Sequence, residues 1–164
     1  MGLINELAEK ISKWESSIAD YKCKYKTAQN EAYRLASDIY WEKKRETPNN
    51  EILISLEKQK DEAEEDMAKA QNGLNSIFLE LKQNIFLIDD NMVKIEKSTN
   101  GLIGMGSSSQ YAKVGLSSSA VKAKLQEIKE VVLHFKKLRD KLIELCYECD
   151  PKSGDDDKPK VKRI

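Results

Sequence analysis

The stretch INELAEKISKWESSIADYKCKYKTAQNEAYRLASDI, residues 4–39, decides the fold because its apolar residues follow a heptad pattern. Alternating steps of three and four residues from Ile4 reach eleven positions, and each holds an apolar or aromatic side chain. These positions are Ile4, Leu7, Ile11, Trp14, Ile18, Tyr21, Tyr25, Ala28, Ala32, Leu35 and Ile39. At 40% hydrophobic residues, chance produces such a pattern with a probability on the order of 10⁻⁵. The stretch therefore predicts a long amphipathic helix over residues 3–46.

A second heptad pattern follows a turn sequence. Thr47-Pro48-Asn49-Asn50 offers a capping residue followed by proline, which is favoured at the first position of a helix. The pattern then runs from Leu53 to Ile95, and ten of its thirteen positions are apolar. It predicts a helix over residues 49–98. Two helices of this length, joined by so short a connection, fold back on each other as an antiparallel hairpin.

The remaining sequence predicts one more helix between two irregular segments. Ser98 to Ser119 contain four of the seven glycines and seven serines, which predicts a loop over residues 99–118. An apolar pattern from Val121 to Cys149 predicts a third helix over residues 119–148. The charged residues 150–164 predict a disordered tail.

Together these segments predict an all-α fold, a long antiparallel coiled-coil hairpin with a shorter third helix packed at one end. Residues 1–149 would form a single elongated bundle. The apolar face of the second predicted helix broadens after residue 77. We therefore expect the third helix at the end that holds the N-terminus and the Gly/Ser loop, where it would leave the hairpin turn uncovered.

The composition excludes several classes of protein. The chain has 164 residues, with 28 basic and 28 acidic side chains, so it lacks the basic surplus that binds nucleic acid. It has no run of about 18 apolar residues, which argues against membrane insertion. The N-terminus has no signal-peptide pattern, and an odd count of three cysteines makes no disulfide framework. We expect a cytoplasmic protein.

No catalytic, cofactor or metal site can be assembled from the sequence. The single histidine, His134, has no serine, cysteine or acid placed to activate it. The spacing Cys146-x-x-Cys149 is found in zinc sites and redox pairs. Cys23 and His134 are not spaced as the missing zinc ligands, and a redox pair works best at a helix start, whereas this one lies at a predicted helix end. The glycine-rich segment 101–109 lacks the Gly-Lys-Ser/Thr ending of a phosphate loop. We expect structural thiols, no cofactor, no metal and no enzyme activity.

Three aromatic residues lie outside the first heptad pattern. Tyr33, Tyr40 and Trp41 are spaced by seven and eight residues, so they share one outer face of the predicted helix near the turn. If the third helix does not reach them, they form an exposed docking surface for a protein partner. If the bundle is more compact, they are ordinary core residues. The sequence leaves both interpretations open.

One short motif is similar to a known one. Phe86-Leu-Ile-Asp-Asp90 matches the F-x-x-x-D motif of one group of partner proteins encoded beside LXG toxins. The layout of two long helices also resembles the WXG100-like family of Gram-positive type VII secretion. The chain has neither their Trp-x-Gly turn nor a Tyr-x-x-x-Asp/Glu export signal. The resemblance implies a catalytically inert cytoplasmic protein that binds the helical region of a toxin and is exported with it.

The sequence therefore favours a non-catalytic helical interaction protein, an adaptor or chaperone that binds a helical partner such as a secreted toxin. The expected partner-binding residues are Tyr33, Tyr40, Trp41, Phe86 and Asp90. An elongated bundle also has apolar edges that association with further copies would cover. The alternative is a self-assembling coiled-coil scaffold. A discrete complex with a partner would support the adaptor, whereas higher homo-oligomers alone would support the scaffold.

Overall fold

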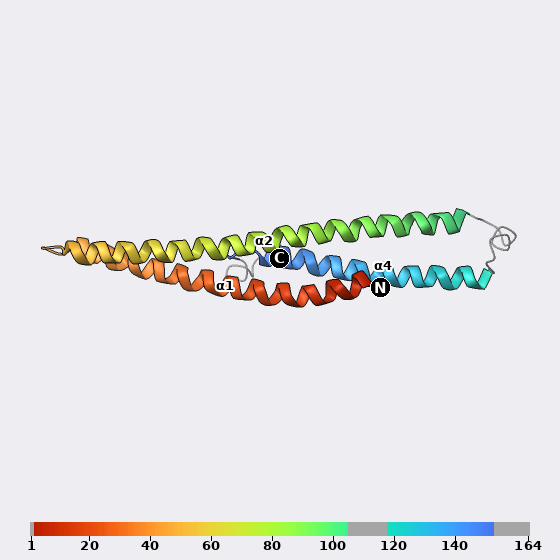
Figure 1. Cartoon of the computed structure of the whole chain (residues 1–164), viewed down its shortest axis with the longest axis horizontal. Helices are drawn as coiled ribbons and strands as arrows, with labels where there is room; N and C mark the ends of the chain where they lie inside the picture. Colours follow the sequence, from red (N-terminus) through yellow and green to blue (C-terminus); the bar gives the residue numbers. More distant parts are fainter. Residues whose placement is uncertain (1, 105–117, 153–164) are drawn as a thin grey trace, which may run out of the picture. The chain divides into compact units, whose positions relative to one another are not determined.

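The computed structural model describes residues 2–104 and 118–152, and within these ranges the regular structure is helical (Figure 1). The helices are α1 (Gly2–Lys43), α2 (Asn50–Gly104) and α4 (Ser118–Glu148). The prediction of an all-α fold, with a long helix pair and a shorter third helix, is confirmed. Within the described residues, no helix has an apolar stretch long enough to cross a membrane.

The helices contribute to two compact units. One unit, here called the hairpin unit, comprises Ser12–Leu79 and, of the described residues, 145–152. The other, here called the three-helix unit, comprises Met1–Ile11 and Glu80–Glu144. Each unit has buried side chains of its own.

The turn between α1 and α2 differs from the sequence-based expectation. Helix α1 ends at Lys43, three residues before the predicted end, and α2 begins at Asn50. Asn49, and not Thr47, is the capping residue, because its Oδ1 accepts a hydrogen bond from the backbone N–H of Ile52 at 3.1 Å. The prediction that Pro48 opens the helix is therefore wrong.

Helix α2 also continues past its predicted end. It reaches Gly104, so the predicted loop over residues 99–118 is wrong for residues 99–104. A glycine in a helix costs only about 1 kcal/mol, and an existing helix gains one hydrogen bond for each added residue. The Thr99 hydroxyl donates a hydrogen bond to the carbonyl of Ile95, four residues earlier on α2, at 2.9 Å. The polar side chain of Thr99 is therefore accommodated by the helix itself. Residues 105–117 of that loop, and residues 153–164 of the predicted tail, lie outside the described residues.

In the hairpin unit, two alanines lie at a contact between α1 and α2. α1 and α2 run antiparallel, and Ala32, Leu35 and Ala63 form a buried cluster with Leu56 and Met67 packed against it. The first heptad pattern is buried as expected over most of its length. Its buried members in this unit are Trp14, Ile18, Ala28, Ala32, Leu35 and Ile39.

A glycine marks a second close approach of the two helices in this unit. A methyl group added at Gly73 of α2 would overlap the ring of Tyr21 on α1. The end of α4 also packs here, with Cys149 buried and Lys22 Nζ within 3.0 Å of Glu148 Oε1. The alternation of small and large side chains therefore sets how closely the helices pack.

The three-helix unit has an aliphatic core of its own. Its fully buried side chains come from all three helices; they are Leu7, Leu81, Ile88 and Leu142. Val121 and Phe135 of α4 are also buried. Burying a side chain of this size stabilises a fold by about 1.5–3 kcal/mol. This unit is where α4 meets the second half of α2, as the broad apolar face of that segment predicted.

Candidate interaction surfaces

The predicted aromatic residues are exposed in the hairpin unit. Tyr33, Tyr40 and Trp41 have exposed fractions of 67%, 53% and 65%, so the interpretation that they are core residues is wrong. The rings of Tyr40 and Trp41 meet edge to face with centroids 5.1 Å apart, and Lys44 Nζ lies 5.4 Å from the Tyr40 ring centroid. We call Tyr33, Tyr40 and Trp41 the aromatic surface.

A buried carboxylate fixes the end of α1 next to this surface. Glu42 is only 9% exposed, and its Oε2 accepts the backbone N–H of Asn49 at 2.9 Å. Arg45 Nη1 donates to both carboxylate oxygens of Glu42, at 3.1 and 3.0 Å. The Asn49 N–H, assisted by the Arg45 guanidinium, holds the pKa of Glu42 below its ordinary value of 4.5.

Glu42 was not among the residues predicted from the sequence. One signal for it was available, because Glu42 occupies the next step of the first heptad pattern after Ile39. The heptad step indicates an inward-facing position, and the arginine three residues later is within reach of an ion pair with it.

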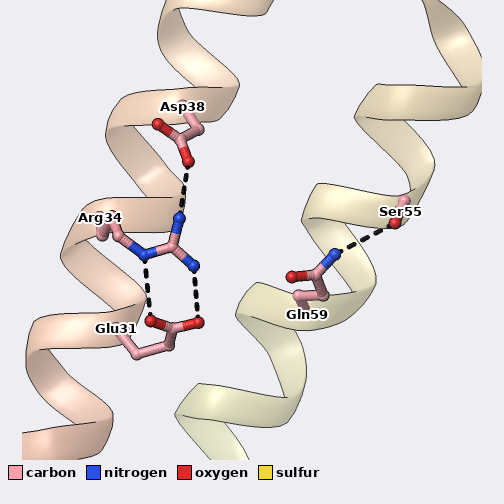
Figure 2. Close-up of polar contacts among 5 residues, drawn as sticks. All are labelled: Glu31, Arg34, Asp38, Ser55 and Gln59. Atoms are coloured by element: carbon pink, nitrogen blue, oxygen red, sulfur yellow. Dashed lines mark hydrogen bonds and ion pairs between the residues drawn. The ribbon is translucent and has the colours of Figure 1, made fainter.

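An arginine bridges two acids along the same helix. Arg34 donates to Glu31 through Nε at 3.1 Å and Nη2 at 2.7 Å, and to Asp38 through Nη1 at 3.0 Å (Figure 2). The hydrogen bonds from Arg34 hold the pKa of Glu31 below its ordinary value. All three side chains are about half exposed, so solvent screens their pairing and they stabilise the helix little. They form a polar rim next to Tyr33.

On α2, Figure 2 shows a neutral contact on the helix next to that rim. Gln59 Nε2 donates to Ser55 Oγ at 3.1 Å, four residues earlier. The residues drawn on both helices are therefore bound to neighbours on their own helix. The aromatic surface lies beside these polar residues on α1 and is exposed to solvent.

The two motif residues of α2 are exposed in the three-helix unit. Phe86 has an exposed fraction of 71%, and Leu87 and Val93 are also exposed. Asp90 lies one turn after Phe86 and pairs with Lys94, with 3.3 Å between Oδ2 and Nζ. Leu81 and Ile88, on the opposite face of the same stretch, are fully buried. We call Lys82, Phe86, Leu87, Asp90 and Val93 the α2 surface.

A groove runs between α2 and α4 in the same unit. It has a volume of about 410 Å³, and its lining residues within the described part of the chain come from these two helices. Its lining includes Met92 and Ile95 of α2 and Lys129, Val132, Leu133 and Lys136 of α4. This groove was not predicted from the sequence. Its signal was the apolar face of the third predicted helix, which Val132 widens beyond one narrow seam.

The cysteines are free and differ in exposure. Cys23 is exposed, Cys146 is half-buried and Cys149 is buried. Burial, together with the neighbouring Cys146 and Glu148, raises the pKa of Cys149 to about 11 against the opposing charge of Lys22. This thiol stays protonated at neutral pH and is a poor nucleophile. Over residues 2–104 and 118–152, no three His, Cys, Asp or Glu side chains gather to hold a metal ion.

Comparison with known proteins identifies no relative, since no protein-family model, no curated protein and no solved structure matches the chain. A function is therefore inferred from the surfaces of the molecule itself.

Proposed function

We propose that this protein is a non-catalytic interaction protein, an adaptor or chaperone, that binds an amphipathic helix of another protein in the groove between α2 and α4. The observation that carries this proposal is that the described residues lining an apolar groove come from two helices, in a unit otherwise built from three. A pair of helices buries one face of each, and a third helix laid along the groove covers the remaining apolar side chains.

The charges beside the groove define the chemistry of that partner. Lys129 and Lys136 are seven residues apart on α4, so both lie on the α4 side of the groove, whereas the acid Glu96 lines it from α2. A helix with an apolar stripe, and with acidic residues seven apart along one flank, matches this arrangement. Charge complementarity of this kind fixes the orientation of the bound helix more than it adds affinity.

The aromatic surface offers a second contact region on the hairpin unit. Exposed tyrosine and tryptophan side chains are enriched among the residues that dominate binding energy at protein interfaces. The resemblance to type VII secretion partners suggests the helical region of a secreted toxin as the bound protein, met in the cytoplasm and exported as a complex. This assignment rests on the motif Phe86–Asp90 and on the helical layout.

A designed peptide tests the groove directly. The probe is a three-heptad amphipathic helix with leucines at its apolar positions and glutamates along one flank, and the control probe carries lysines in their place. Fluorescence anisotropy should show micromolar binding of the acidic peptide, and about tenfold weaker binding of the basic one. Leu133→Glu should abolish binding, because Leu133 lines the groove and its exposure lets the fold tolerate the change.

A matched variant controls for added charge. Ile54→Glu places the same side chain at an exposed apolar position of α2 in the hairpin unit, and binding should persist. Equal affinity for the two peptides, or binding that survives Leu133→Glu, would exclude the groove as the docking site.

A further inference from the structure

The α2 surface carries opposite charges on either side of an exposed aromatic ring. Lys82, Phe86 and Asp90 follow each other at intervals of four residues, so they form one ridge along α2. Phe86 is 71% exposed, and Leu87 and Val93 add exposed apolar area beside it. A large ring left in water next to two aliphatic side chains is typical of an interaction surface.

This ridge is complementary to itself in one orientation only. In the commonest class of helix packing, ridges of residues four apart lie alongside each other at a crossing angle near −50°. If two such ridges run antiparallel, Phe86 meets Phe86 of the second copy, and Lys82 meets its Asp90. If they run parallel, Lys82 meets Lys82 and Asp90 meets Asp90. The antiparallel arrangement satisfies both the apolar and the charged residues.

We propose that two copies of this chain associate through the α2 surface, around a two-fold axis at Phe86. In such an isologous contact every pair occurs twice, so the two Lys82–Asp90 pairs flank the paired rings symmetrically. Asp90 already pairs with Lys94, and Lys82 also has an interaction within its own chain. These side chains are exposed, and exposed polar contacts exchange readily, so they do not prevent the pairing between copies.

The expected dimer has low affinity and does not grow into larger oligomers. One helix face of this length buries less than the roughly 1,600 Å² of a standard interface, and interfaces of small area are typical of weak, transient contacts. We therefore expect a dissociation constant in the micromolar range. A two-fold contact uses the same surface on both copies and leaves none free for a third. Phe86 does not line the groove between α2 and α4, so dimerisation is independent of the proposed helix binding.

Charge reversal tests the pairing. Sedimentation equilibrium of the full chain should show a monomer–dimer equilibrium. Lys82→Asp and Asp90→Lys, made singly, should each raise the dissociation constant about tenfold, and the double variant should restore it. Lys24→Asp, which reverses an equally exposed charge in the hairpin unit, should leave the equilibrium unchanged. A chain that stays monomeric at several hundred micromolar, a chain that forms higher oligomers, or a double variant without recovery would overturn the proposal.

A cross-linking pair tests the position of the axis. In a background with Cys23→Ser, Cys146→Ser and Cys149→Ala, confirmed as helical by circular dichroism, Phe86→Cys should oxidise to a disulfide-linked dimer. Val93→Cys should not, because seven residues on each side of the axis separate the two cysteines by about 21 Å along the helices. Cross-linking of the Val93→Cys chain as fast as that of the Phe86→Cys chain would show that the register is wrong.

Discussion

Arg139 of α4 donates a hydrogen bond through Nε to Oδ1 of Asp89 on α2, at 2.7 Å. A second, longer hydrogen bond joins its Nη2 to Oδ2 at 3.4 Å, so one guanidinium engages both carboxylate oxygens. The carboxylate of Asp89 raises the pKa of Arg139. The pair links two helices in the three-helix unit and, unlike the pairs along single helices, restricts how α4 can slide past α2.

Breaking this pair should destabilise the protein modestly. Both side chains are more than a third exposed, so solvent screens the interaction, and Asp89→Asn should lower the free energy of unfolding by about 1 kcal/mol. Urea denaturation measures the change. Glu65→Gln removes a longer and more exposed pair with Lys69 and should have no measurable effect. Equal effects of the two variants would show that the Arg139 geometry adds nothing.

Gly73→Ala should destabilise the hairpin unit although alanine is the better helix former. The added methyl group overlaps the Tyr21 ring, and overpacking of this kind costs about 1–3 kcal/mol, against a gain of about 1 kcal/mol in helix propensity. Thermal denaturation followed by circular dichroism reports the difference. In a Tyr21→Ala background the overlap disappears, so there the same substitution should stabilise. If Gly73→Ala stabilises both backgrounds, the close approach of the two helices is not present.

Acidification should loosen the turn between α1 and α2 through Glu42. Its pKa is lowered in the folded state, so its contribution to stability is present above its ordinary pKa of 4.5 and is lost as the pH falls through the folded value. The urea midpoint of the natural chain should therefore fall more steeply below pH 4.5 than that of Glu42→Gln. Glu46→Gln, at an exposed position nearby, should follow the natural chain. Parallel curves for Glu42→Gln and the natural chain would remove Glu42 from this role.

Truncating the aromatic surface should leave the fold intact. Tyr40→Ala combined with Trp41→Ala should change the free energy of unfolding by no more than about 0.5 kcal/mol, because both rings are more than half exposed. Leu35→Ala, at a fully buried position of the same helix, should cost about 2–5 kcal/mol. Loss of helical signal in the double variant would mean that these rings pack into the core after all.

The heptad patterns predict the helices and their buried faces, because both depend on the spacing of residues along the chain. A helix repeats its faces every few residues, so spacing alone assigns the apolar positions from Leu7 to Ile39 to one buried face. The third helix was predicted within one residue of its observed bounds for the same reason. The exposure of Trp41 could not be decided in this way, because it depends on how far a segment distant in sequence reaches.

The start of α2 shows what local sequence signals cannot predict. Thr47 and Pro48 carry the stronger local signal for a helix start, yet Asn49 caps the helix. The N–H of Asn49 is held by Glu42, seven residues earlier on another helix. A contact of this kind produces no periodic pattern in the sequence, so spacing cannot predict it. The groove beside Lys129 and Lys136 is formed by residues of both α2 and α4, so the pattern of either helix alone does not predict it.

The two tryptophans of the chain lie in opposite environments, and this makes them built-in optical reporters. Trp14 is 7% exposed and Trp41 is 65% exposed. Emission from Trp14 should lie at shorter wavelength and shift toward the red when the core opens. Emission from Trp41 begins in water and should shift toward the blue when another molecule covers the ring. A Trp14→Phe chain therefore reports, through Trp41, whether a bound molecule covers the aromatic surface. A Trp41→Phe chain reports, through Trp14, whether the core unfolds.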